Sequence, residues 1–159
     1  EEVFSPLNQA ILLGDSKSVD KLINAKAHLD FVDNTGLYPL LAAAKKQNLS
    51  ILKKLLKNGA TADNRNPAQI STMMLAVVFS DTTFLKTLLN SDANPNLELP
   101  DGNTAFSIAA LLKNNPALEL LHKNGAKPKL TTQLPNFLIK YLNKECKSGN
   151  KSLCEALQR

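Results

Sequence analysis

The sequence predicts an all-α fold, a solenoid of short antiparallel helix pairs, and two observations carry this prediction. Alanine recurs with a period of 33 residues, at Ala27, Ala60, Ala93 and Ala126. A fixed period of this length indicates that the chain repeats one supersecondary unit. Aromatic residues make up only 5% of the chain and Trp is absent, a balance that suits small repeated helices better than a sheet core.

The elements of one unit can be justified in order from the second copy, where the signals are clearest. Pro39 suits the first turn of a helix, and the small residues in 40–44 make a short first helix. Asn48 ends that segment, and apolar residues then recur at helical spacing over 49–56, which predicts a second helix. Gly59 stops the second helix because glycine tolerates positive φ. Each unit is therefore predicted to be two short helices followed by a turn-rich connector.

The repeated string resembles the ankyrin repeat. The second copy reads Asp-x-x-Gly-x-x-Pro-Leu-x-x-Ala-Ala and later Leu-Leu-x-x-Gly-Ala, and the match covers residues 5 to about 129 in four copies. The resemblance implies an ankyrin-repeat solenoid, in which β-hairpin-like connectors join paired helices. It divides a single domain, residues 1–159, into units of about 1–32, 33–65, 66–98 and 99–131 and a divergent capping unit, 132–159.

Two positions of the unit depart from the family pattern. The turn glycine is kept at Gly59 and Gly125. Lys26 and Asp92 stand there in the other copies, and the left-handed conformation should cost on the order of 1 kcal/mol for lysine and less for aspartate. The histidine that usually follows Pro-Leu is absent from all four copies, and its place is taken by Asn8, Leu41, Met74 and Ser107.

Cys146 and Cys154 are the two cysteines of the chain, and both lie in the expected capping unit. A disulfide between them would imply an oxidising compartment, whereas two reduced thiols would suit a cytosolic protein. The chain begins at Glu1 without an initiator Met, as it would after trimming or removal of a signal peptide. Together these features slightly favour a periplasmic or secreted location over a cytoplasmic one.

The charge of the chain leaves nucleic-acid binding as a low-ranked alternative. The net charge is +5, and a basic protein can attract nucleic acid. The charge is carried mainly by lysine, whereas base readout usually recruits arginine, so solvated helix faces are the favoured interpretation. A nucleic-acid patch would use Lys45, Lys46, Lys53, Lys54 and Lys57. The sequence contains no run of eighteen apolar residues, so no membrane-spanning helix is predicted.

Motifs for catalysis are missing from the sequence. It contains no phosphate-binding glycine loop, no paired-carboxylate arrangement and no metal-binding helix motif, and cysteines eight residues apart match no zinc spacing. His28 is expected to face solvent. His122 occupies the column of Ile23, Leu56 and Leu89 and is expected to be a half-buried packing residue. We therefore predict a non-enzyme with no cofactor, metal or small-molecule substrate.

Apolar residues stand where the ankyrin pattern expects exposed ones, and they suggest a partner-binding surface. The resemblance implies that first helices and connector tips line a concave side that receives protein partners. Three of the four pairs that follow the Ala-Ala position are apolar, and a soluble monomer rarely keeps such a patch uncovered. The pairs are Leu12-Leu13, Lys45-Lys46, Val78-Phe79 and Leu111-Leu112, and the tips add Phe4, Leu37 and Ile70. The alternative is that some of these residues tuck under neighbouring connectors.

These observations predict a module that binds another protein through its concave face. Phe79 is the expected central anchor, and Lys45 and Lys46 would face acidic groups on the partner. The working hypothesis is an exported immunity or inhibitor protein that neutralises a secreted toxin, because the chain is similar to small bacterial ankyrin proteins of that kind. The alternative is an intracellular scaffold or a host-directed effector.

Overall fold

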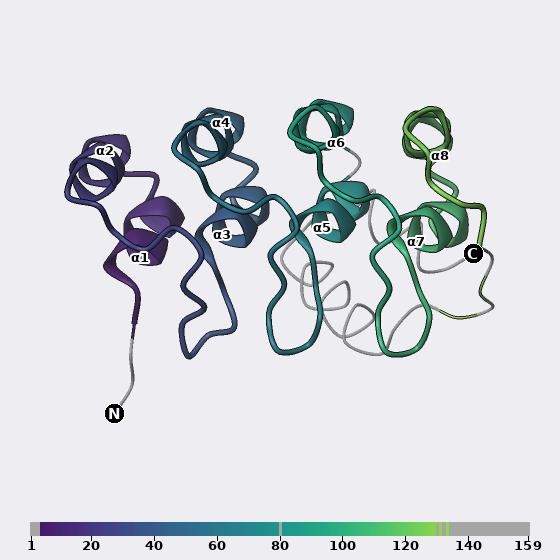
Figure 1. Ribbon diagram of the computed structural model, residues 1–159, viewed down its shortest axis with the longest axis horizontal. Coiled ribbons are helices and arrows are strands. Elements are labelled where there is room, and N and C mark those ends of the chain that lie inside the picture. The colour runs from purple at the N-terminus through teal and green to yellow at the C-terminus, as the bar shows by residue number, and fades with distance from the viewer. Residues whose placement is uncertain (1–3, 80, 130, 132, 134–159) are drawn as a thin grey trace.

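The computed structural model describes residues 4–79, 81–129, 131 and 133, and in them four antiparallel helix pairs stand in a row (Figure 1). One layer holds the first helix of each pair and the other layer holds the second. The helices are α1 (Pro6–Leu13), α2 (Ser16–Asn24), α3 (Pro39–Lys45), α4 (Leu49–Lys57), α5 (Thr72–Val78), α6 (Thr82–Leu89), α7 (Ala105–Leu111) and α8 (Asn115–Lys123). The predicted all-α solenoid is confirmed. Over the described residues the connectors contain no strand longer than an isolated antiparallel bridge between Arg65 and Ser71.

In each pair, the second helix is preceded by an Asp or Asn N-cap residue that recurs with the 33-residue period. The side-chain oxygen of this residue accepts a hydrogen bond from a backbone N–H in the first turn, which would otherwise have no partner inside the helix. These N-cap residues are Asp15, Asn48, Asp81 and Asn114. Asn48 therefore caps the start of α4, whereas α3 already ends at Lys45 and the left-handed Gln47 lies between the two helices.

Shortly after its last residue, the second helix of each pair is followed by a residue with left-handed backbone. Gly59 and Gly125 have φ values of 94° and 85°, and Lys26 and Asp92 adopt 63° and 60° at the equivalent places. The predicted left-handed conformation of these two non-glycine residues is confirmed. The period alanine follows directly, and its N–H donates to the carbonyl five residues earlier, as in Ala60 to Leu55 at 3.0 Å. This bond pairs one of the carbonyls that a helix end leaves open.

The apolar core runs along the whole row, between the two layers and between neighbouring pairs. α3 packs against α1 and α5, and α5 packs against α3 and α7. The second helix of each pair, which we call the outer helix, contacts the outer helix of the next pair. All seven residues of α5 are buried. The small side chains of Ala42, Ala43 and Ala44 are also buried, so neighbouring first helices can approach closely. Each unit thus completes the core of the unit beside it.

A ladder of side-chain hydrogen bonds ties the connectors together. The Asp30 carboxylate accepts a bond from the backbone N–H of Thr61 at 2.8 Å. One unit further on, Asp63 accepts from the N–H of Asn94 at 2.7 Å. A further unit on, the Asn96 side chain accepts from the N–H of residue 127 at 2.7 Å. The side chain has the same place in each unit, so these bonds hold neighbouring connectors in register.

The expected capping unit, residues 132–159, lies outside the described residues apart from Gln133. Cys146 and Cys154 lie outside them as well, so the disulfide stays a prediction.

Substituting Lys26→Gly is expected to stabilise the fold. Lys26 is exposed and left-handed, so glycine relieves a backbone cost of about 1–2 kcal/mol. Glycine also raises the conformational entropy of the unfolded chain, which offsets part of that gain. We expect the free energy of unfolding to rise by about 0.5–1 kcal/mol, measured by urea denaturation.

The neighbouring Ala25 provides the matched control. Its φ is −78°, where alanine carries no such cost, so Ala25→Gly should lower the free energy of unfolding by about 0.5–1 kcal/mol. Equal losses in both variants would contradict the expected relief of strain at Lys26.

Candidate interaction surface

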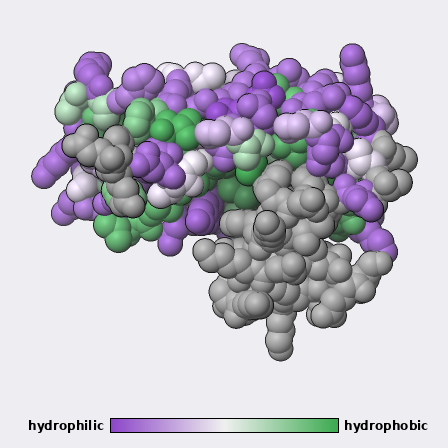
Figure 2. Space-filling view, turned by 90° about the horizontal axis from the view of Figure 1, so that it is seen from below, coloured by the Kyte–Doolittle hydropathy of each residue, from purple (hydrophilic) through white to green (hydrophobic). Residues whose placement is uncertain are grey.

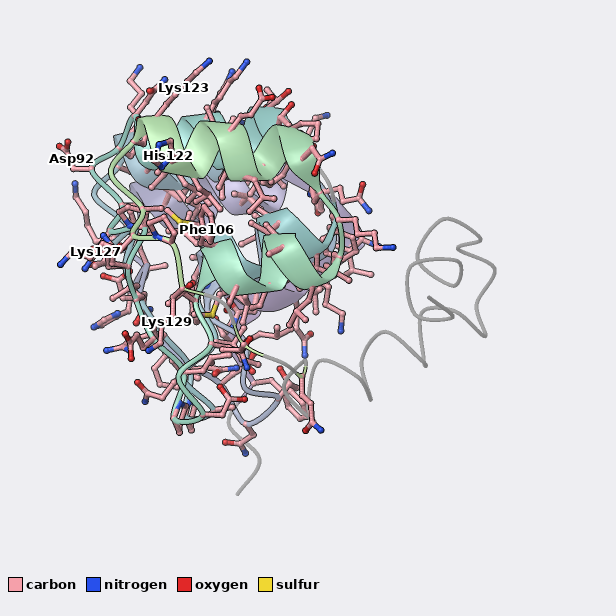
Figure 3. The ribbon with its side chains drawn as sticks, turned by 90° about the vertical axis from the view of Figure 1, so that its right-hand side faces the viewer. Asp92, Phe106, His122, Lys123, Lys127 and Lys129 are labelled. Atoms are coloured by element: carbon pink, nitrogen blue, oxygen red, sulfur yellow. The ribbon has the colours of Figure 1, made fainter. Side chains whose placement is uncertain are left out.

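The inner surface of the molecule is formed by helices α1, α3, α5 and α7 together with the tips of the connectors, which project from the helix layers (Figures 1 and 3). We call the tips fingers: finger 1 is 33–37, finger 2 is 66–70 and finger 3 is 99–103. In each finger the first N–H donates to the last carbonyl, for example Asp33 to Leu37 at 2.9 Å. The shared closure gives the three fingers one shape, on which side chains vary.

A pocket opens on the inner surface between fingers 1 and 2. Its volume is about 200 Å³, and its floor is apolar because four buried side chains from three inner helices meet there: Leu41, Met74, Leu75 and Ile108. The half-buried Leu37 and Ile70 line it from the two fingers, and the exposed Lys45 lies at its edge. Viewed from the side of the fingers, the molecule shows hydrophobic surface bordered by hydrophilic residues (Figure 2).

Tyr38 supports finger 2 from below. It occupies the N-cap position of α3 but makes no side-chain cap there. Its buried hydroxyl instead lies 2.7 Å from the carbonyl oxygen of Asn64 and 3.3 Å from that of Ile70, and it accepts a bond from Thr72 Oγ1 at 3.1 Å. Burial raises the pKa of Tyr38 above its ordinary value, so the hydroxyl keeps the proton that it donates to these carbonyls.

Asp33 holds finger 1 in place. Burial alone would raise the pKa of this carboxyl, but hydrogen bonds from Thr35, Asn8 and the backbone N–H of Leu37 together outweigh it and leave the pKa below its ordinary value. The side chain of Asn8 donates to Asp33 Oδ2 at 2.8 Å. The carboxylate is therefore charged at neutral pH, and its bonds lie within the finger and back to α1.

The residues predicted to bind a partner differ widely in exposure. Leu13 is 83% exposed and Phe4 45% exposed, and Lys45 and Lys46 are exposed as well. Leu12, Leu37, Ile70, Phe79 and Leu112 are half-buried against the core, and Leu111 is half-buried as well.

Val78 corrects one of these predictions. It is only 3% exposed, so the expectation that it faces solvent is wrong. The reason is its place in the row: α5 packs between α3 and α7, and an aliphatic side chain at this position contributes to the core. At the equivalent position of α3 the longer Lys45 reaches water.

Sequence reasoning missed the floor of the pocket. Leu41 and Met74 stand where the repeat pattern usually has histidine, and this departure was the signal that could have found them. Leu75 and Ile108 carried no such signal, because an apolar residue on an inner helix is expected in any unit. Only the packing of three neighbouring units shows that the four side chains meet.

The two histidines do not form a site. His28 is exposed as predicted, and its Nδ1 accepts a bond from the N–H of Asp30. His122 is also exposed, so the expectation of a half-buried packing histidine is wrong. It lies on the outer helix α8 (Figure 3), which packs against α6 and α7 among the described helices, and its imidazole remains in water.

Two further findings concern the described part of the chain. None of its helices is both long and apolar enough to cross a membrane. No three of its His, Cys, Asp or Glu side chains are grouped so that they could hold a metal ion. Of the lysines proposed for nucleic acid, Lys45 and Lys46 lie at the end of α3 and the other three lie on α4, where Lys54 pairs with Asp20 at 2.7 Å.

Comparison with known proteins decides the family of this chain. The family description "Ankyrin repeats (3 copies)" matches residues 7–98, which is more than half of the sequence. The chain belongs to the ankyrin-repeat family. Ankyrin repeats are generally modules for protein–protein interaction, and membership of the family implies that role for this chain.

Relatives of this ankyrin chain are much longer proteins. Human transient receptor potential cation channel subfamily A member 1 is 33% identical over 129 residues, which are 80% of this chain and 11% of that protein. Mouse neurogenic locus notch homolog protein 1 is 32% identical over 121 residues, 76% of this chain and 5% of that protein. Mouse ankyrin repeat and SAM domain-containing protein 6 is 29% identical over 114 residues, 70% of this chain and 13% of that protein. The chain thus spans only a small part of each of them.

Replacing Tyr38 by Phe is expected to destabilise this ankyrin chain by about 1–3 kcal/mol, because the change removes the hydroxyl that donates to the carbonyl oxygen of Asn64. The pairwise interaction between the hydroxyl groups of Tyr38 and Thr72 can be isolated by a double-mutant cycle with Thr72→Val, measured by urea denaturation. The double variant should lose less than the sum of the two single variants. Additive losses would show that the hydroxyl pair is not coupled.

Proposed function

We propose that this chain binds another protein along its inner surface. The observation that supports the proposal is the apolar pocket between fingers 1 and 2, with Lys45 at its edge. Ligand sites are typically concave and mostly apolar, with a few polar groups that fix orientation. The exposed Leu13 and Phe4 add apolar surface in the first unit. The proposal contains no catalytic step and needs no cofactor.

The narrower hypothesis is that the chain is an exported inhibitor that neutralises a secreted toxin. It rests on sequence patterns, namely the apolar positions of the inner surface and the cysteine pair. The competing hypothesis is an intracellular scaffold or host-directed effector with reduced thiols. Both use the same inner surface, because the identity of the partner depends on the side chains that the scaffold carries and not on the scaffold itself.

Site-specific photo-crosslinking tests the use of the inner surface. A benzophenone amino acid placed at Thr35 or at Lys46 should crosslink to a partner protein in extracts of the source cells. Thr35 is exposed and lines the pocket, and Lys46 is exposed directly after α3. The same group at Lys53, which is exposed on the outer helix α4, is the matched control. Crosslinks of equal yield at Lys53, or none at the inner positions, would refute the proposal.

Cell fractionation with thiol alkylation separates the two narrower hypotheses. An exported inhibitor should be recovered from the periplasmic or secreted fraction, with Cys146 and Cys154 resistant to alkylation until a reductant is added. A protein from the intracellular fraction whose cysteines react without reductant would instead support the scaffold. Neither result changes the expectation for the inner surface.

A further inference from the structure

The two middle units differ from the outer two at a position that faces the fingers. In chain order this position holds Asn8, Leu41, Met74 and Ser107. In the first unit, the Asn8 side chain donates to the carbonyl of Leu37 in finger 1 at 2.9 Å. In the fourth unit, Ser107 Oγ donates to the side chain of Asn103 in finger 3 at 3.0 Å. In the first and fourth units this side chain therefore hydrogen-bonds to a polar atom of a finger. In the two middle units Leu41 and Met74 cannot donate such a bond.

The second unit avoids the cost of this change through Tyr38. The carbonyl of Ile70 corresponds, one unit further on, to the carbonyl that Asn8 bonds in finger 1. Leu41 has no donor for it, but the Tyr38 hydroxyl lies 3.3 Å away. Asn66 adds a bond between the fingers, because its amide donates to the carbonyl of Gly36 at 3.1 Å. The fingers therefore remain supported while the floor between them is apolar.

The pocket is large enough for a side chain of a partner. Its volume of about 200 Å³ exceeds that of an engineered apolar cavity of about 150 Å³ that binds benzene. One phenylalanine or leucine side chain would therefore fit. Leu41, Met74 and Ile108 offer it a floor that makes no demand for a hydrogen bond.

The charge around the pocket determines which residues of the partner fit next to that side chain. Helices α1, α3, α5 and α7 contain no aspartate or glutamate, and Lys45 is the ionisable residue within them. Lys46 follows it directly and is exposed. A segment lying along these helices would meet positive charge beside the pocket and no carboxylate on the inner helices, so acidic residues next to the apolar one fit best.

We propose that the pocket between fingers 1 and 2 receives an apolar side chain from an acidic segment of a partner protein, and that Lys45 and Lys46 pair with carboxylates on either side of it. The inference rests on the proposed function and specifies the chemistry of the partner. The buried side chain supplies most of the affinity, and the lysines select acidic over basic segments.

The two methionines of the chain make a direct test possible. Met74 lines the pocket, whereas Met73 is buried beside it in sequence and does not line it. With [¹³C]methyl-methionine labelling of the full chain, the probe acetyl-Glu-Glu-Phe-Glu-Glu-amide should move the Met74 signal saturably and leave the Met73 signal in place. We expect a Kd at or below about 1 mM. The analogue with Ala in place of Phe should cause no shift, and the analogue with Lys in place of Glu should bind at least about fivefold more weakly.

A pair of charge reversals provides the matched control. Lys45 and Lys53 are both exposed helical lysines, one beside the pocket and one on the outer helix α4. Lys45→Glu should weaken the acidic probe about fivefold or more, while Lys53→Glu should change its Kd less than about twofold.

Several outcomes would overturn the inference. These are an unmoved Met74 signal at about 1 mM probe, equal binding of the acidic and basic probes, or equal effects of the two reversals. A Met74 signal that shifts on dilution of the protein alone would assign the pocket to a second copy of the chain. Displacement of the probe by a synthetic peptide of residues 134–159 would assign it to the chain's own end, and a stronger response to oligouridylate would assign it to nucleic acid. Crosslinks from Thr35 without a probe response would leave the inner surface as an interface and reject only the pocket chemistry.

Discussion

None of the four helix pairs in the described part of the chain buries its apolar surface alone, and the rest of that structure depends on this constraint. α5 is buried along its whole length because α3 and α7 cover it from both sides. Burying one Leu or Ile side chain contributes about 1.5–3 kcal/mol, and neighbouring first helices that carry such buried residues pack against one another. Stability therefore resides in the contacts between units as much as within them.

Polar groups follow the same period as the core. The Asp or Asn that opens each second helix and the left-handed residue that closes it recur every 33 residues, so helix ends meet the same partners in each unit. The ladder through Asp30, Asp63 and Asn96 then holds the connectors at one spacing. With this framework fixed, the fingers and inner helices can carry different side chains without loss of register.

What the sequence could predict is what one unit determines by itself. The period, the two helices of the second unit and the left-handed Lys26 follow from local patterns, and all of them agree with the structure. The burial of Val78 and the exposure of His122 depend on which neighbours pack against each helix, and spacing within a unit does not reveal that. The pocket needed three units at once, although the missing histidines at Leu41 and Met74 were visible in the sequence.

The pocket belongs to a junction, since no single unit contains it. Finger 1 and Leu41 come from one unit, and finger 2 and Met74 come from the next. Duplication or exchange of whole units would therefore juxtapose new pairs of walls and floors, with the hydrogen-bonded framework already in place. Such a chain could acquire a new recognition site by recombination alone, before any point substitution occurs.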